Sequence, residues 1–188
     1  MHPMRICSML WLFLLVVWLV FGFRRKRTQE RESLASRLKY SIPTVLGFYL
    51  LFADRIDFGW LHSRFIASTQ AVNILGVALT ASGILFAVWA RVYIGENWSG
   101  IVTVKVGHEL VRTGPYAWVR HPIYSGLLLA TLGTALVRGE VPGLIALGIL
   151  WSGFWIKSRV EEEFMLKTFG PAYAEYSQAT GALIPRLH

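Results

Sequence analysis

Two clusters of charged and aromatic residues in the C-terminal half carry the side chains best suited to chemistry. The first is the segment 120–126, which reads Arg-His-Pro-Ile-Tyr-Ser-Gly, and the second is the downstream triplet Glu161, Glu162 and Glu163. Pro122 is well placed as the first residue of a helix, whose start offers free backbone N–H groups and a partial positive charge. The first cluster therefore suits an anionic group, and the paired carboxylates suit a positive one.

The stretch between the two clusters decides whether they can meet. Two apolar runs, 127–137 and 144–156, are joined there by a turn-rich segment at 138–143. Each run, with its flanks, is long enough for one pass through a somewhat thinned bilayer or for one tilted pass. Two antiparallel passes return the chain to the side that it left. A helical hairpin over 122–158 is therefore predicted to bring both clusters together at one membrane face.

Short motifs in the C-terminal half occur in a recognisable order. They are Gly107-His108-Glu109-Leu110-Val111, Gly114-Pro115-Tyr116, the segment 120–126, Glu161-Glu162 and the tail 169–176. This pattern resembles the isoprenylcysteine carboxyl methyltransferase family of integral-membrane enzymes, which use S-adenosylmethionine. The upstream Asn97-Trp98-Ser99 resembles the prokaryotic members of that family. The specific match covers roughly the C-terminal half, whereas the N-terminal half agrees only in being hydrophobic with a basic loop.

The resemblance implies that most of the site binds S-adenosylmethionine. The cofactor-binding residues expected from it are His108, Leu110, Val111, Tyr116, His121, Pro122, Tyr124, Glu161 and Glu162. Arg120, His121 and the helix start would cradle the cofactor carboxylate, while Glu161 and Glu162 would attract its ammonium and sulfonium. Glu163 is expected to be a solvated neighbour.

The catalytic candidates are Arg120 and Glu162, with Arg120 facing the carboxylate of the acceptor. Arg91 is a second candidate for that role, or else an anchor that snorkels to the membrane surface. No metal site is expected, because the remaining histidines show no ligand spacing and Cys7 is the only cysteine.

Composition and hydropathy predict one all-α integral-membrane domain over 1–188. Apolar residues make up 54% of the chain, and apolar stretches at 6–23, 40–52 and 71–93 precede the hairpin. Five transmembrane helices are therefore expected, three within 1–93 and two within a cofactor-binding catalytic region over 94–188. In the third span, small residues offer a face for close helix contact: Gly76, Thr80, Gly83 and Ala87. The segment 101–106 could form a short extended piece or an irregular loop.

Loop charge predicts the orientation in the membrane. The net charge is +8, and a clear basic excess lies at 24–39, directly after the first span. Basic residues in such a place mark a cytoplasmic loop and not a nucleic-acid surface, whereas the loop 54–68 is balanced and expected outside. Counting passes then places 95–121 and the tail from Lys157 in the cytoplasm, where S-adenosylmethionine is available. We expect a multi-pass protein of a prokaryotic inner membrane with a cytoplasmic C-terminus and membrane lipids as partners.

Methyl transfer from a sulfonium is a direct displacement, and a carboxylate acceptor is already ionised at neutral pH. Such an acceptor needs positioning more than a general base. The resemblance implies a lipophilic, isoprenylcysteine-like acceptor. Three alternatives stay open: a phospholipid amine or small thiol as acceptor, an NADPH-dependent reductase of sterol-like double bonds, and a structural or lipid-binding membrane protein. The reductases share a similar Arg-His-Pro segment but usually have more spans.

Overall fold

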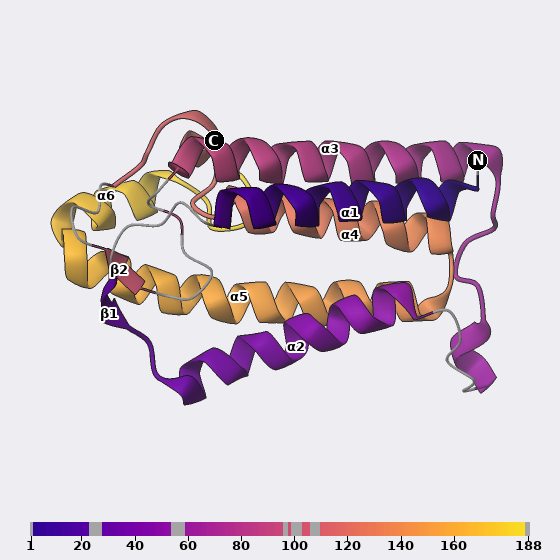
Figure 1. The fold of residues 1–188 in the computed structure, drawn as a ribbon, viewed down its shortest axis with the longest axis horizontal. Helices are drawn as coiled ribbons and strands as arrows, with labels where there is room; N and C mark the ends of the chain where they lie inside the picture. Colours follow the sequence, from indigo (N-terminus) through magenta and orange to yellow (C-terminus); the bar gives the residue numbers. More distant parts are fainter. Residues whose placement is uncertain are drawn as a thin grey trace.

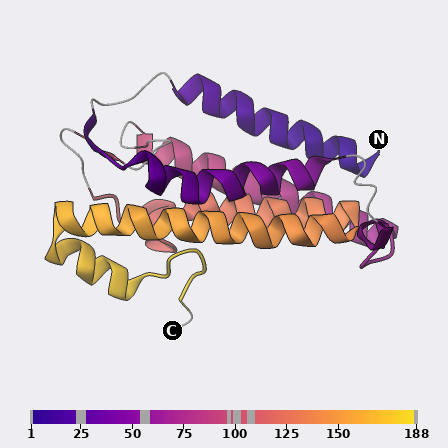
Figure 2. The same ribbon diagram turned by 90° about the horizontal axis from the view of Figure 1, so that it is seen from below.

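A computed structural model describes residues 2–22, 28–53, 59–95, 98, 103–105 and 110–186. Five long helices lie side by side, each running opposite to the one before it (Figure 1). They are α1 (Pro3–Gly22), α2 (Leu34–Phe52), α3 (Gln70–Ile94), α4 (Pro122–Arg138) and α5 (Val141–Phe169). The shorter elements are the 3-10 helices η1 (Gly59–His62) and η3 (Gly114–Ala117) and the helix α6 (Pro171–Ala179). Figure 2 shows α6 folded back beside the end of α5.

A small antiparallel sheet lies at the same end of the bundle as α6 (Figure 1). It consists of β1 (Thr28–Arg31) and β2 (Thr103–Lys105). The extended piece considered for 101–106 is therefore confirmed in its middle, and its partner strand comes from the loop predicted to be basic. The basic cluster at 24–27 lies outside the described residues, as do 54–58 of the loop expected outside.

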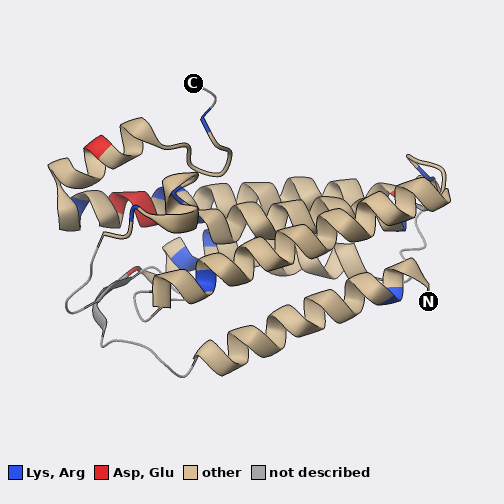
Figure 3. Cartoon of the chain, turned by 90° about the horizontal axis from the view of Figure 1, so that it is seen from above, with Lys and Arg blue, Asp and Glu red and all other residues tan. Residues whose placement is uncertain are grey.

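All five expected helices are present, and three of them are long and apolar enough to cross a membrane: α1, α3 and α5. Helix α4 is apolar but has only 17 residues. Among the described residues, Lys, Arg, Asp and Glu gather toward the two ends of the bundle and leave its middle uncharged (Figure 3). This distribution is the one expected of an integral membrane protein.

Helix α5 continues far beyond the apolar run at 144–156. It has 29 residues, which at about 1.5 Å per residue gives a length of about 44 Å, against about 30 Å for the hydrocarbon core. The extension is helical because its Glu, Leu, Met and Lys residues are strong helix formers. Its last turns therefore carry Glu161, Glu162 and Glu163 to the end of the bundle where α4 begins.

Helices α3 and α4 pack closely because glycines face each other at two levels. A Cβ on Gly83 would lie 2.4 Å from the backbone N of Ala130 and 2.5 Å from the carbonyl O of Gly126. A Cβ on Gly133 would lie 2.4 Å from the carbonyl O of Gly76. The small-residue face predicted for the third span is buried throughout, so that prediction is confirmed. These contacts fix the position of α4 in the bundle.

At the opposite end of the bundle, a partly buried arginine closes the hairpin onto α2. Arg138 Nη1 donates to the carbonyl oxygens of Leu50 at 2.7 Å and Leu51 at 3.1 Å. Its Nε donates to Glu140 Oε2 at 3.2 Å. The last carbonyls of α2 thereby find a cationic donor, which is favourable at a helix C-terminus.

The glycine contact between α3 and α4 predicts a loss of stability when it is filled. Gly83→Ala places a methyl group against backbone atoms that cannot move aside, and overpacking of this kind costs about 1–3 kcal/mol. Thermal unfolding in detergent should show a lower melting temperature. Gly148→Ala is the matched control, because nothing lies within 4 Å of a Cβ there. Equal melting temperatures for the two variants would contradict the packing argument.

Candidate functional site

The hairpin brings the two predicted clusters together. His121 directly precedes α4, and Glu161 and Glu162 lie in the last third of α5. His121 Nδ1 is 3.3 Å from Glu161 Oε2, and His121 Nε2 is 3.2 Å from Glu162 Oε1. The predicted meeting of the Arg-His-Pro segment with the glutamates is therefore confirmed.

Arg120 is held entirely by protein acceptors. Its Nε and Nη2 each lie 2.8 Å from Glu162 Oε1. Its Nη1 donates to the carbonyl oxygen of Ser177 at 2.8 Å and to that of Thr180. One guanidinium thus joins the end of α5 to the C-terminal end of α6.

Tyr124 contacts both members of the pair formed by His121 and Glu161. Its hydroxyl donates to Glu161 Oε1 at 2.6 Å. Its ring stacks on His121, with centroids 5.6 Å apart and planes 13° apart, and on Phe154, at 5.1 Å and 4°. The three stacked rings restrict the motion of the imidazole beside both carboxylates.

The two carboxylates differ in accessibility. The side chain of Glu161 is 22% exposed, whereas those of Glu162, Arg120 and His121 are 11%, 10% and 8% exposed. Glu162 also receives three basic partners, the third being Arg159 Nη1 at 3.4 Å. Glu161 is therefore the more available of the two carboxylates for a positively charged ligand, and Glu162 is the more committed to the protein.

The charge state of His121 follows from its neighbours. Burial by itself lowers the pKa of the ring, but hydrogen bonds and charge attraction from Glu161 and Glu162 outweigh it and raise the pKa above its ordinary value. Both ring nitrogens face carboxylate oxygens, and only the protonated ring has two donors. His121 stands at the N-cap position, but its side chain makes no capping hydrogen bond because the glutamates take it.

Residues 181–183 of the C-terminal tail also contact the site. No pattern in the sequence indicated these contacts. The backbone N–H of Arg120 donates to Gly181 O at 2.8 Å, and that of His121 donates to Ala182 O at 3.1 Å. Ser125 Oγ donates to Leu183 O at 2.6 Å. The sequence motif ended at residue 176, and backbone carbonyl acceptors leave no trace in side-chain patterns.

The structure describes four of the other predicted ligand residues, which are Pro122, Tyr116, Val111 and Leu110. Pro122 is the first residue of α4, as predicted. Tyr116 is buried, its hydroxyl 3.4 Å from the carbonyl of Ala90, and Val111 packs against the same apolar cluster. Leu110 is partly buried in the loop before it. His108, Asn97 and Ser99 lie outside the described residues.

Arg91, the second candidate for the acceptor carboxylate, is 1% exposed. Its Nη1 donates to Gly95 O at 3.0 Å and its Nη2 to Phe21 O at 2.8 Å. Its guanidinium carbon lies 4.3 Å from the ring centroid of Trp98. Arg91 therefore joins the ends of α1 and α3 inside the protein, and the alternative of a snorkelling anchor is wrong.

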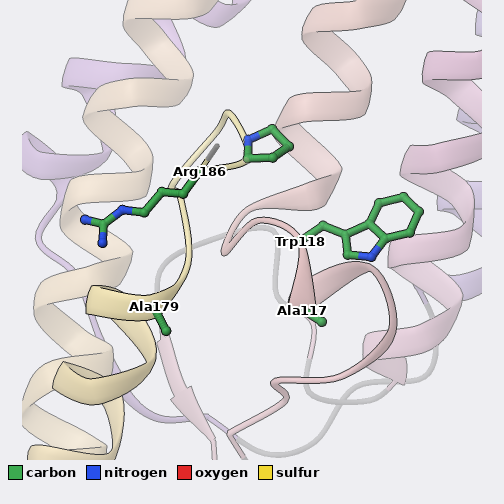
Figure 4. Close-up of a pocket in the computed structure, with 5 residues that line it drawn as sticks. Ala117, Trp118, Ala179 and Arg186 are labelled. Atoms are coloured by element: carbon green, nitrogen blue, oxygen red, sulfur yellow. The ribbon is translucent and has the colours of Figure 1, made fainter. Parts of the chain in front are cut away.

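A surface hollow of about 290 Å³ lies beside the C-terminal tail. It is lined by Ala117, Trp118, Ala179, Pro185 and Arg186. Figure 4 shows the side chains of Trp118 and Arg186 extending to opposite sides of it. No side chain that lines it reaches Glu161 or Glu162 in the described interactions, so we assign the site to the charged group.

Comparison with known proteins finds a matching family model and several similar curated proteins. A family model described as phospholipid methyltransferase matches residues 71–172. The protein-S-isoprenylcysteine O-methyltransferase of Saccharomyces cerevisiae is 34% identical over 121 residues, 63% of this chain and 51% of the yeast protein. The Tribolium castaneum enzyme of the same name is 36% identical over 153 residues, 78% of this chain and 52% of its own length. The chain thus spans about half the length of these curated relatives.

A solved structure supports the same relationship. The eukaryotic intramembrane Ras methyltransferase, an isoprenylcysteine carboxyl methyltransferase, superposes with a TM-score of 0.59 at 26% identity. The match covers 82% of this chain and 54% of that one. The resemblance expected from the sequence motifs is confirmed.

The raised pKa of His121 predicts pH-dependent stability. A raised folded-state pKa means that the protonated ring stabilises the fold; this contribution is complete below about pH 6.5 and is lost as pH rises through the folded-state pKa. Melting temperatures of the unaltered protein and His121→Gln should differ most near pH 6 and converge in alkali. His2→Gln, at an exposed position, is the control. A difference that is constant with pH would contradict the assignment.

Proposed function

Because the chain belongs to the phospholipid methyltransferase family, we propose that it transfers the methyl group of S-adenosylmethionine to a lipophilic acceptor in the membrane. The favoured acceptor group is the carboxylate of an isoprenylcysteine-like molecule, as the names of the curated relatives indicate. The observation that carries the proposal is the convergence of His121, Tyr124 and Glu161 at the end of the helical hairpin.

We place the site on the cytoplasmic face of a single membrane domain over 1–188. Helices α1 to α5 would each cross the bilayer, with α4 accommodated by local thinning. The segment 1–93 would supply three of the crossings and 94–188 the other two. The gathering of charge at both ends of the bundle supports this arrangement (Figure 3), and the C-terminus would be cytoplasmic.

The charges of the site fit a zwitterionic donor. S-adenosylmethionine, when bound, supplies a methyl group activated by a sulfonium. Glu161 offers the accessible carboxylate for a positive group of the donor. The start of α4 leaves the N–H groups of Ile123 and Tyr124 without intrahelical partners, and these suit the donor carboxylate. As the resemblance implies, Leu110, Val111, Tyr116 and His108 would border the adenine side.

Arg120, His121 and Glu162 would act by positioning. Arg120 gives its donors to Glu162 and to two carbonyls, which leaves its guanidinium committed to holding α5 against α6. His121 fixes the side chain of Glu161 through Nδ1. Removing one partner of such a buried group would leave an uncompensated charge. Arg120 holds Glu162, Glu162 contacts His121, and His121 contacts Glu161.

The chemistry then requires little proton transfer. A carboxylate acceptor is ionised at neutral pH, so the protein has to align it with the methyl group and exclude water. Alignment alone can supply about 7–11 kcal/mol in favourable cases. A phospholipid amine is the second candidate acceptor, favoured by the description of the matching family model. It would need to lose a proton, and Glu161 cannot take that proton while it holds the positive group of the donor.

Donor binding tests the site directly. Isothermal titration of the detergent-solubilised protein with S-adenosylhomocysteine should show binding, and Glu161→Gln should weaken it about tenfold or more, because a hydrogen bond to a charged group is worth about 1.5–3 kcal/mol. Glu163→Gln, at an exposed neighbour on the same helix, should bind like the unaltered protein. Absence of binding at millimolar ligand would refute the proposal.

The product identifies the acceptor group. Protein incubated with methyl-labelled donor and an S-prenylated cysteine should form a methyl ester, which releases labelled methanol in base. A phosphatidylethanolamine acceptor would instead give a base-stable N-methyl product. Labelled N-methyl lipid without any ester would overturn the carboxylate assignment in favour of the amine.

A further inference from the structure

A group of exposed aromatic rings lies on the surface at the end of the bundle where α4 begins. The indole of Trp118 stacks on the ring of Phe86, with centroids 6.0 Å and planes 16° apart, and meets Trp89 edge-on at 5.7 Å. Trp118 is 58% exposed and Trp89 is 42% exposed. Exposed indole rings are typical of the boundary between the hydrocarbon and the headgroups of a membrane.

Helix α3 gives the depth of these rings in the membrane. Phe86 lies eight residues before the end of the helix at Ile94, which is about 12 Å along the axis at about 1.5 Å per residue. Helix α3 is also one of those long and apolar enough to cross a membrane. Trp118 belongs to the loop before α4, yet it stacks on the outer turns of a span. We therefore place the surface beside Trp118 at the level of the lipid headgroups.

The hollow of about 290 Å³ opens at this surface. Three of its lining residues, Ala117, Ala179 and Pro185, are small or apolar. The side chains of Arg186 and Trp118 extend on opposite sides of it (Figure 4). A ligand in the hollow would therefore meet a cation toward one side, an indole toward the other and small side chains between them. This order of groups fits an amphiphile with an anionic head.

Arg186 retains donors for such a ligand. Its Nη1 donates to the carbonyl oxygen of Gln178, near the C-terminal end of α6. Among the described residues, its guanidinium makes no other hydrogen bond or ion pair with the protein. A guanidinium has five N–H donors in a planar fork that matches the geometry of a phosphate. Most of these donors can therefore reach an anion in the hollow.

The part of the tail that lines the hollow also holds the charged group. Between Ala179 and Pro185, the carbonyl oxygens of residues 180–182 accept hydrogen bonds from Arg120 and His121. A ligand seated against both Ala179 and Pro185 would restrict the motion of these carbonyls. Occupancy of the hollow would thus stabilise the shell around Arg120.

We propose that the hollow binds an anionic phospholipid, and that the bound lipid holds the tail against Arg120 and His121. The phosphate pairs with Arg186, and the glycerol and first acyl carbons lie toward Trp118. A zwitterionic lipid binds less well, because its own ammonium competes with Arg186 for the phosphate. The lipid site stands without the proposed function, whereas its effect on the methyl donor rests on that function.

Native mass spectrometry of the full chain released from detergent tests the lipid site. Given equal amounts of phosphatidylglycerol and phosphatidylcholine with the same acyl chains, the unaltered protein should retain phosphatidylglycerol in preference. Arg186→Gln should reduce this preference about fivefold, the factor that one basic residue contributes near an anionic surface. Lys167→Gln is the matched control and should keep the preference. It removes the same charge from an exposed position near the end of α5 that does not line the hollow.

Two further arms identify the ligand as a lipid. Trp118→Ala should lower the retention of phosphatidylglycerol, because the acyl chains lose the indole as a partner. Trp60→Ala is its control, since Trp60 is 68% exposed but lies in η1 at the opposite end of the bundle (Figure 1). An excess of sn-glycerol 3-phosphate, which has no acyl chains, should leave the bound lipid in place.

Donor binding in lipid nanodiscs tests the effect on the charged group. S-adenosylhomocysteine should bind about fivefold or more tightly when the nanodisc contains phosphatidylglycerol than when it contains phosphatidylcholine alone. Attraction to the anionic surface does not account for this gain, because the zwitterionic S-adenosylhomocysteine has no net charge. Arg186→Gln should lose the gain, and Lys167→Gln should keep it.

Each measurement has a result that would overturn its part of the inference. Equal retention of the two lipids by the unaltered protein, or a folded Arg186→Gln protein that keeps the preference, would overturn the lipid site. Displacement of the lipid by sn-glycerol 3-phosphate would assign the hollow to a free phosphate instead. Equal donor affinity in the two nanodiscs would overturn the effect on the charged group. Failure of the donor to bind in either nanodisc would overturn the proposed function while the lipid site stands.

Discussion

The site depends on opposite charges that are buried together where α4 begins and α5 approaches its end. Arg120 and His121 on one side and Glu161 and Glu162 on the other leave little of their charge to solvent. A buried charge without its partner costs about 3–5 kcal/mol, so the register of the hairpin is constrained at this point. The same group also draws in α6, whose C-terminal carbonyls complete the shell around Arg120.

Elements far from the charges keep this group in place. The glycine contacts between α3 and α4 leave no space for a shift of α4 along its neighbour. Arg138 anchors the turn of the hairpin to the last carbonyls of α2. Because a helix transmits position along its axis, these contacts determine where His121 and Glu161 meet at the other end. The geometry of the charged group at one end of the bundle therefore rests on packing along the whole length of the helices.

The helical hairpin and the meeting of the two charged clusters could be predicted from patterns of side chains. The contacts of individual residues within the site could not. Two apolar runs and a proline at a helix start were enough to predict the hairpin and the meeting of the Arg-His-Pro segment with the glutamates. The sequence did not reveal that Arg120 donates hydrogen bonds to two backbone carbonyls, since a backbone carbonyl has no sequence signature. It also did not place Lys157 between Tyr40 and Tyr124, because contacts across three helices depend on rotations that periodicity leaves open. The end of α5 was missed for a related reason, as hydropathy marks only the apolar part of a longer helix.

The central claim is that this charged group binds the methyl donor. An experimental structure of the protein with S-adenosylhomocysteine would test it most directly. The account predicts density for the ligand in contact with Glu161 and Tyr124, beside the start of α4, with Arg120 still bonded to Glu162. Density elsewhere, for example in the hollow beside Trp118 or at the end of the bundle near Arg138, would contradict it.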